Sequence, residues 1–184
     1  MQADTSDIPR GRRHGRKPLR LSSFEFQKFF IRVANPVLRS ENTLRTREYK
    51  QHGCISCYDH SLAVAFYSLK IANRFRMRCN RESLVKGALL HDFFLYDWHV
   101  ADRSHGLHGF THSRTALHNA AMEFNLDKIE KDIILSHMFP LNLKPPRCKE
   151  SWIVWLVDKF CSLAETFGLA AYPAVAGLYE TEAL

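Results

Sequence analysis

Apolar residues recur at intervals of three and four along most of the chain, the spacing that places side chains on one face of a helix. The longest such stretch, residues 58–77, contains neither Gly nor Pro and predicts a long, largely buried helix. His60 lies in its first turn, and His91 and Asp92 fall at the end of the helix that follows. Further helices are expected at residues 24–35, 38–50, 81–92, 112–124, 128–137 and 151–167.

Residues with suitable capping chemistry stand where these helices should begin and end. Asp127 and Glu130 form a D-x-x-E capping box, in which each side chain accepts a hydrogen bond from the other residue's backbone. The Asn35-Pro36 pair should end the first helix, because proline disfavours helical backbone in the residue before it. The other expected caps are Ser22 or Ser23, Asn80, Thr111 and Ser151 at helix starts and Gly168 at the last helix end.

No stretch alternates apolar and polar residues between turn signals, and no glycine-rich loop follows a strand pattern. A parallel-sheet nucleotide fold is therefore disfavoured. The 184 residues suffice for one domain, and 46% of them are hydrophobic. We predict an all-α protein, a single compact bundle of about six to eight helices over residues 21–184, with its motif-bearing core at residues 50–167.

The net charge of +7 is concentrated in one tail. Residues 1–20 hold six Lys or Arg against two Asp, a net charge of +4 that leaves only +3 for the rest of the chain. With few apolar side chains to bury, residues 1–20 are predicted to be a disordered basic tail. No aromatic residues interleave with these charges as a base-stacking platform would require, so a solvated tail is favoured over a nucleic-acid-binding arm.

The apolar stretches are far shorter than the roughly 20 residues that cross a bilayer, and no secretory signal is visible. Five cysteines at uneven spacing do not resemble the disulfide framework of a small secreted protein. The sequence therefore predicts a cytoplasmic protein without a membrane partner. The spacing Cys54-x-x-Cys57-x-x-His60 could belong to a zinc site, but no second pair completes four ligands, and buried thiols are favoured.

Ten histidines in one small domain, together with an aspartate inside an apolar helix, indicate a metal site. Carboxylates are seldom fully buried unless they are paired or bind a metal. Imidazole and carboxylate together suit first-row ions such as iron, manganese and zinc. Residue chemistry alone leaves two interpretations of Asp158 open, a metal ligand or a buried salt bridge to an arginine.

Three motifs favour the metal ligand: "YDHSLAVA" around His60, "GALLHDFFLYDWH" around His91 and Asp92, and "IVWLVDKFCS" around Asp158. Their order, H, HD, D, on helices resembles the HD-domain superfamily of metal-dependent phosphohydrolases. The resemblance implies a helical fold in which His60, His91, Asp92 and Asp158 hold a catalytic metal. It also implies that Asp92 is the catalytic residue that steers the attacking water.

Two further histidines stand where the two-metal members of this superfamily carry additional ligands. His112 opens the helix in "HGFTHSRTAL", and His137 ends the helix in "ILSHMFP". His108 competes with His112 for the first position, whereas His52 and His118 are interpreted as surface residues. Asp59 and Asp97 can serve either as acceptors for ligand imidazoles or as surface charges.

The resemblance implies hydrolysis of a phosphate ester or anhydride in a small phosphorylated metabolite, with a nucleotide favoured. Candidate phosphate-binding residues are Arg114, Lys144, Arg147 and Lys159. The cofactor is expected to be one or two divalent ions among iron, manganese, zinc, magnesium and nickel, with iron or manganese favoured. A di-iron oxygenase using the same ligands and a non-catalytic nucleotide-binding module remain alternatives. The "HDFF" sequence and the lack of Gly-Tyr-Pro after His137 argue against a cyclic-dinucleotide substrate, and a homodimer is left open.

Overall fold

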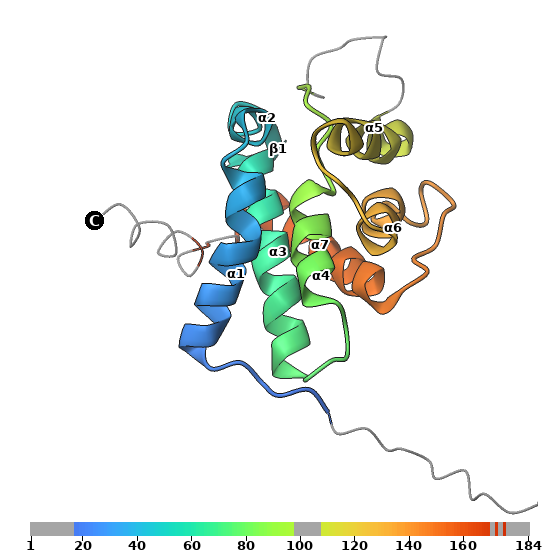
Figure 1. The fold of residues 1–184 in the computed structure, drawn as a ribbon. Helices are drawn as coiled ribbons and strands as arrows, with labels where there is room; N and C mark the ends of the chain where they lie inside the picture. Colours follow the sequence, from blue (N-terminus) through green and yellow to red (C-terminus); the bar gives the residue numbers. More distant parts are fainter. Residues whose placement is uncertain (1–16, 98–107, 170–171, 173–174, 176–184) are drawn as a thin grey trace, which may run out of the picture.

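The structure, a computed structural model, describes residues 17–97, 108–169, 172 and 175. These residues form seven helices and one short hairpin, which confirms the all-α prediction (Figure 1). The hairpin of β1 (Lys50–His52) and β2 (Ile55–Ser56) was not predicted, because strands of three and two residues are too short to show an alternating pattern. The helices are α1 (Ser23–Leu38), α2 (Glu41–Arg45), α3 (Cys57–Arg74), α4 (Arg81–Leu90), α5 (His108–Glu123), α6 (Lys128–Ser136) and α7 (Lys149–Thr166).

Most helix ends follow the capping chemistry of the sequence. Ser22, Asn80 and the Asp127–Glu130 box cap α1, α4 and α6 as expected. The prediction for Ser151 was wrong: α7 begins earlier, after Cys148, and the Ser151 hydroxyl donates to Asp132 instead.

Other helix boundaries also differ from the sequence predictions. The helix expected at residues 38–50 is the shorter α2, which ends at Arg45, and β1 begins at Lys50. Helix α5 begins at His108, so Thr111 lies in its first turn and not before it. Helix α1 continues past Pro36 to Leu38, because a proline in the last turn removes only one hydrogen bond before the helix ends.

Helices α3 and α4 pack against each other at the centre of the molecule (Figure 1). Helix α1 packs on α4 and contacts α3 through the edge-to-face rings of Phe30 and Phe66, both of which are buried. Helices α6 and α7 contact each other and α4, and α7 also packs along α3. The ends of α4 and α6 and the middle of α7 therefore converge, which positions the polar cluster described below.

Helices α4 and α6 approach closely at Gly87. A Cβ atom at this position would lie 2.6 Å from Cδ1 of Ile133, which is fully buried. The absence of a side chain at residue 87 thus sets the spacing of the two helices whose C-terminal ends carry His91 and His137.

Residues 1–16 lie outside the described residues, so the disordered-tail prediction remains a prediction. Pro18 and Leu19 belong to the predicted tail of residues 1–20 and are described: their backbone carbonyl groups accept hydrogen bonds from Arg76 and Arg81. Among the described residues, no helix combines the length and the apolar character that crossing a membrane requires.

Replacing Gly87 by valine should lower the free energy of unfolding by about 1–3 kcal/mol, because the new side chain overlaps Ile133. Urea denaturation measures this change. Adding Ile133→Val removes the overlapping Cδ1 atom, so the double variant should lose less stability than the sum of the two single variants. Strictly additive losses would show that the contact does not limit helix spacing.

Candidate metal centre

Five helices bring six buried side chains to one point: His60 from the first turn of α3, His91 and Asp92 at the end of α4, His112 from α5, His137 at the end of α6 and Asp158 from the middle of α7. Each of these residues is at most 4% exposed. The structure thus brings together all six residues that the sequence singled out as metal ligands.

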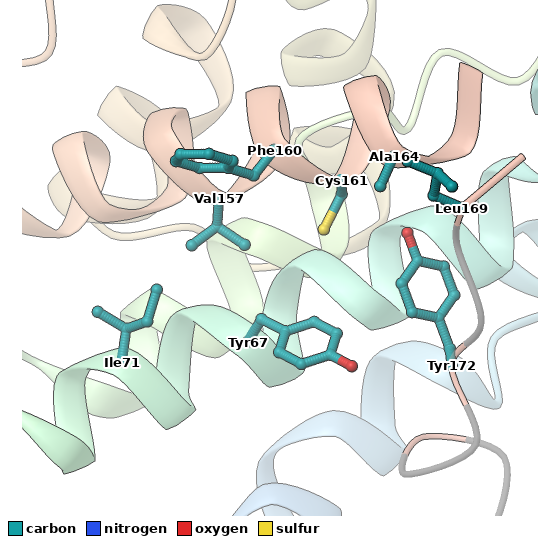
Figure 2. A pocket seen from close by; sticks show the side chains of 8 residues that line it. All are labelled: Tyr67, Ile71, Val157, Phe160, Cys161, Ala164, Leu169 and Tyr172. Atoms are coloured by element: carbon teal, nitrogen blue, oxygen red, sulfur yellow. The ribbon is translucent and has the colours of Figure 1, made fainter. Parts of the chain in front are cut away.

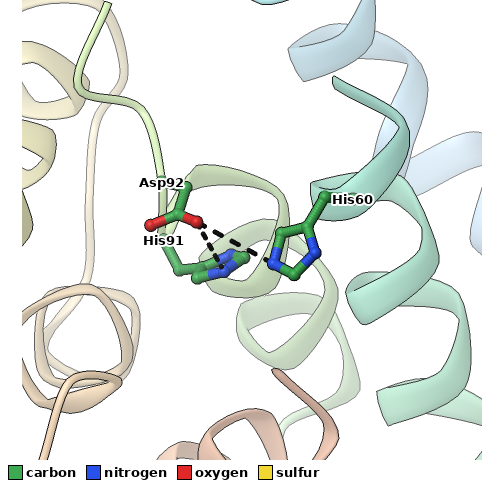
Figure 3. Close-up of side chains that lie close together, drawn as sticks. All are labelled: His60, His91 and Asp92. Carbon is green, nitrogen blue, oxygen red and sulfur yellow. Dashed lines mark ion pairs between the residues drawn. The ribbon is translucent and has the colours of Figure 1, made fainter. Parts of the chain in front are cut away.

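One half of the cluster surrounds the Nε2 atoms of His60 and His91 (Figure 3). Oδ2 of Asp92 lies 3.8 Å from Nε2 of His60 and 3.4 Å from Nε2 of His91. Oδ1 of Asp158 lies 3.2 Å and 3.7 Å from the same two nitrogen atoms. Two imidazoles and two carboxylates thereby face a common centre.

The other half is built on the second oxygen of Asp92. Oδ1 lies 3.3 Å from Nε2 of His112 and 3.2 Å from Nε2 of His137, and the two nitrogen atoms are 2.8 Å apart. Ligand atoms of Asp92, His112 and His137 all lie within 4.8 Å of one another, as do those of His60, His91 and Asp92. Asp92 is therefore shared by two groups that could each hold an ion.

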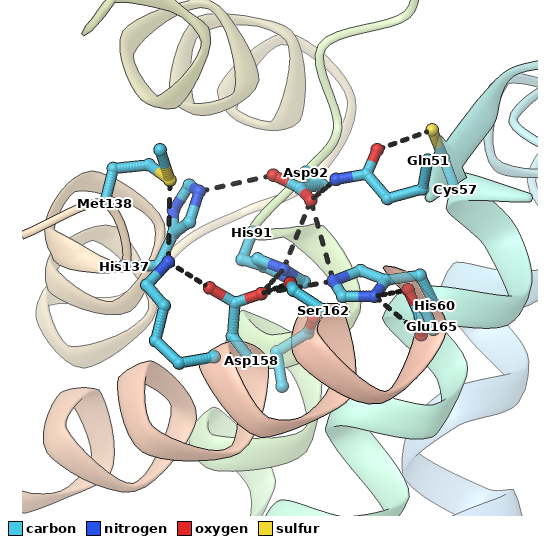
Figure 4. Close-up of polar contacts among 12 residues, drawn as sticks. Gln51, Cys57, His60, His91, Asp92, His137, Met138, Asp158, Ser162 and Glu165 are labelled. Carbon is cyan, nitrogen blue, oxygen red and sulfur yellow. Dashed lines mark hydrogen bonds and ion pairs between the residues drawn. The ribbon is translucent and has the colours of Figure 1, made fainter. Parts of the chain in front are cut away.

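Hydrogen bonds at Nδ1 fix the orientation of three imidazoles. His91 and His137 are helix C-caps, and each donates from Nδ1 to the carbonyl three residues earlier, Ala88 at 2.7 Å and Ile134 at 2.8 Å. Backbone carbonyl groups in the last turn of a helix have no N–H partner within the helix. They are therefore free to accept a hydrogen bond from Nδ1 of a histidine at the helix end. Nδ1 of His60 instead donates to the carboxylate of Glu165 at 2.8 Å (Figure 4), so that Nε2 of all three rings faces the other candidate ligands.

Glu165, the acceptor for His60, was not among the residues predicted from the sequence. Glu165 follows Asp158 by seven residues, two helical turns, and this spacing of two carboxylates in an apolar helix could have identified it. Of the two alternatives left open for Asp59, the structure shows the surface charge: its side chain is exposed and bonded to Ser56 at the start of α3. For Asp97 both alternatives remain predictions.

Gln51, on β1, orients Asp92. Its amide donates to Oδ2 of Asp92 at 2.5 Å, and its carbonyl oxygen accepts from the Cys57 thiol at 3.0 Å. The thiol of Cys57 is thus used in a contact with Gln51, whereas Cys54 is exposed. Of these two cysteines, only Cys57 is a buried thiol, and the two form no shared site in the described structure. His52 was interpreted as a surface residue, but it is half-buried and its ring centre lies 5.7 Å from that of His60.

Two buried polar atoms show that the cluster is incomplete without a ligand. Nε2 of His91 and Oδ1 of Asp92 have no hydrogen-bond partner among the described residues. Leaving such an atom unpaired costs about 1–3 kcal/mol, and more for a charged group. A divalent cation would satisfy both atoms, and histidine with carboxylate is the ligand set of first-row metals.

The electrostatics of the cluster also favour a bound cation. Burial would raise the pKa of Asp92, but the imidazoles of His91, His112 and His137 hold that pKa well below its usual range. Burial would lower the pKa of His60, yet hydrogen bonds to Asp158 and Glu165 raise it to about 10. The buried carboxylates thus require positive charge, which a proton on His60 or a metal cation can supply.

The predicted phosphate-binding residues divide into two groups. Lys159 lies at the cluster, with Nζ 2.8 Å from Oδ2 of Asp158. Lys144 and Arg147 do not reach the cluster: they line a separate cavity on the outer face of α6. Arg114 is exposed on α5 and, like exposed His118, is not part of the described cluster.

A cavity of about 210 Å³ opens onto the cluster. Besides the candidate ligands, side chains of Gln51, His52, Met138, Lys159 and Ser162 line it. The side chain of His108 lies outside the described residues, so only His112 of the two competing histidines is placed in the cluster.

Fold and site together define an all-helical protein with a buried histidine–carboxylate group able to bind metal. The family model for the HD domain matches residues 57–163, more than half of the chain, and the chain therefore belongs to the HD domain family. Membership indicates the superfamily of metal-dependent hydrolases. No curated protein and no solved structure matches the chain.

Replacing Glu165 by alanine should weaken metal binding by about 10- to 100-fold, because the imidazole of His60 loses the acceptor that orients it. Titration of metal against a chromogenic chelator measures this affinity. Glu48→Ala, which removes an exposed carboxylate, should leave the affinity unchanged. Equal affinities of Glu165→Ala and wild type would mean that His60 needs no acceptor or does not bind the metal.

Proposed function

We propose that this protein is a metal-dependent phosphohydrolase acting on a small phosphorylated metabolite, with a nucleotide as the favoured substrate. The observation that carries the proposal is the sharing of Asp92 between two buried groups of candidate ligands. Membership of the HD domain family supports a hydrolytic reaction.

In this proposal, His60, His91, Asp92 and Asp158 hold one divalent ion, and Asp92, His112 and His137 hold a second. Iron or manganese is favoured because both accept mixed imidazole and carboxylate ligands. A bound divalent ion lowers the pKa of water toward neutrality and polarises a phosphoryl oxygen. Asp92 is the proposed catalytic residue, since Gln51 and two imidazoles fix its carboxylate at the centre, where it can position the attacking water.

Lys159 is the proposed contact for the phosphoryl group. Its ammonium lies on the wall of the cavity, bonded to Asp158, and can turn toward an anionic substrate. The described cavity of about 210 Å³ is smaller than the roughly 300–1,000 Å³ of typical small-molecule sites. It therefore suits the phosphoryl end of a substrate, with the remainder lying outside the described walls.

The proposed compartment is the cytoplasm. All five cysteines are free in the structure, and Cys57 and Cys161 are buried as thiols. Free thiols persist in reducing compartments, whereas secreted proteins of this size commonly form disulfides.

Metal content tests the ligand assignment. Protein purified without added metal should contain about two equivalents of iron or manganese by elemental mass spectrometry. We expect about one equivalent in His112→Ala and almost none in Asp92→Ala, because only Asp92 belongs to both groups. His118→Ala removes an exposed histidine of the same helix and should bind as wild type does. One equivalent that is unaffected by His112→Ala would contradict a second site.

Phosphate release tests the reaction. Wild-type protein loaded with manganese should release phosphate or cleave phosphodiesters from a panel of nucleotides and p-nitrophenyl esters. Asp92→Asn should lose at least about 1,000-fold in kcat, because removing an electrostatic group that acts at the transition state costs this much in other enzymes. Lys159→Ala should mainly raise KM.

Other outcomes would replace the proposal. Dioxygen consumption by the iron form without phosphate release would favour a di-iron oxygenase with the same ligands. Tight nucleotide binding without turnover would favour a binding module.

A further inference from the structure

The outer face of α7 carries a continuous apolar stripe. Its members are large side chains that remain 44–69% exposed, although each belongs to a residue type usually buried. They are Trp152, Leu156, Phe160, Leu163 and Phe167.

The spacing within the stripe is that of a helix that packs against another helix. Leu156, Phe160, Leu163 and Phe167 are separated by four, three and four residues, the alternation found along a helix–helix seam. Trp152 extends the row by one turn toward the N-terminus of α7. No element of the described chain packs against these side chains closely enough to bury them.

Free charges are absent from this face within residues 151–169. The charged residues of that range are Asp158, Lys159 and Glu165. Asp158 and Glu165 are buried toward the metal centre, and Lys159 is bonded to Asp158. A helix that faces water normally carries polar residues on its outer side, and 24% of this chain is charged, so the outer face of α7 has the character of a covered surface.

An apolar groove of about 320 Å³ runs beside the stripe, between α3 and α7 (Figure 2). Tyr67 and Ile71 of α3 line one wall, and Phe160 of α7 belongs to both the groove and the stripe. Leu169 and Tyr172 close one end of the groove. One surface of the molecule thus presents protruding aromatic side chains next to an apolar hollow.

We propose that this surface is the interface of a two-fold symmetric homodimer, in which the stripe of each copy packs against the stripe and groove of the other. In a two-fold symmetric interface, the same patch of each copy contacts the other copy. The patch must therefore be complementary to itself, with protruding side chains and a hollow that can receive them. At their observed exposures, the five stripe residues and Leu169 offer roughly 700 Å² of side-chain surface, close to the ~800 Å² that each partner buries in a stable complex.

The chain's own C-terminal segment is a poorer match for the surface. Residues 176–184 contain three large apolar side chains, Leu178, Tyr179 and Leu184, together with two glutamates. Three such side chains cannot cover six exposed ones. A second copy supplies an apolar surface of equal size.

The dimer would leave the metal centre intact. Asp158 and Glu165 lie on the side of α7 opposite the stripe, as their burial against His60 requires. Association and metal binding can therefore be measured independently.

Sedimentation equilibrium of the full chain over a concentration series tests the proposal. Wild-type protein should have twice the 21.4 kDa mass of one chain. Leu163→Glu should raise the dimer dissociation constant at least about 100-fold, because a carboxylate would be buried without a partner. Metal content and the circular dichroism spectrum should stay unchanged. Met122→Glu, a matched change at an exposed apolar residue of α5, should remain dimeric.

Two results would overturn the proposal. A monomeric wild-type protein across the series is one, and a Leu163→Glu variant that dimerises as tightly as wild type is the other. In the first case, a chain truncated after Val175 identifies the covering segment. Increased binding of a hydrophobic dye by that truncated chain would show that residues 176–184 cover the stripe.

Discussion

The buried carboxylate of Asp92 is the constraint around which the structure is arranged. Removing an ion from water costs several kcal/mol even after the protein relaxes, so a fully buried carboxylate needs compensating groups on every side. Here one oxygen faces the imidazoles of His112 and His137, and the other accepts from Gln51 and faces His91. These partners come from β1, α5 and α6 and from the end of α4, so the environment of this one side chain depends on how four elements pack together.

Helix ends supply much of this compensation. His91 and His137 each stand at a helix C-terminus, where unpaired carbonyl groups orient the imidazole. The same carbonyls give the end of a helix partial negative charge, which favours a cation in front of it. Helices α4 and α6 therefore both hold the ligands and add to the attraction for the ion. The close approach of the two helices at Gly87 keeps these ends together.

The helices could be predicted from local pattern, and the resemblance of three motifs to the HD-domain superfamily implied the six candidate ligands. Periodicity places His60, His112 and Asp158 on helices, and helix-ending signals place His91 and His137. The features that could not be predicted depend on the paths that the connecting segments take between helices. Lys144 and Arg147 lie between α6 and α7, and their segment turns to the outer face of α6, away from His137. Gln51 sits on a strand too short to be recognised, and only the fold reveals that it meets Asp92.

Helix α7 shows how one segment can serve two surfaces. Its inner side holds Asp158 and Glu165, spaced two turns apart so that both reach His60. Its outer side repeats apolar residues with nearly the same period, so the helix is apolar around most of its circumference. In an isolated chain this composition exposes aromatic surface to water at a cost of roughly 25 cal/mol per Å². The stripe and the two carboxylates point in opposite directions from the helix axis, so covering the outer side of α7 involves none of the residues that face the metal centre. One helix thus contributes candidate ligands on its inner side and an apolar surface on its outer side, and each side can be altered without changing the residues of the other.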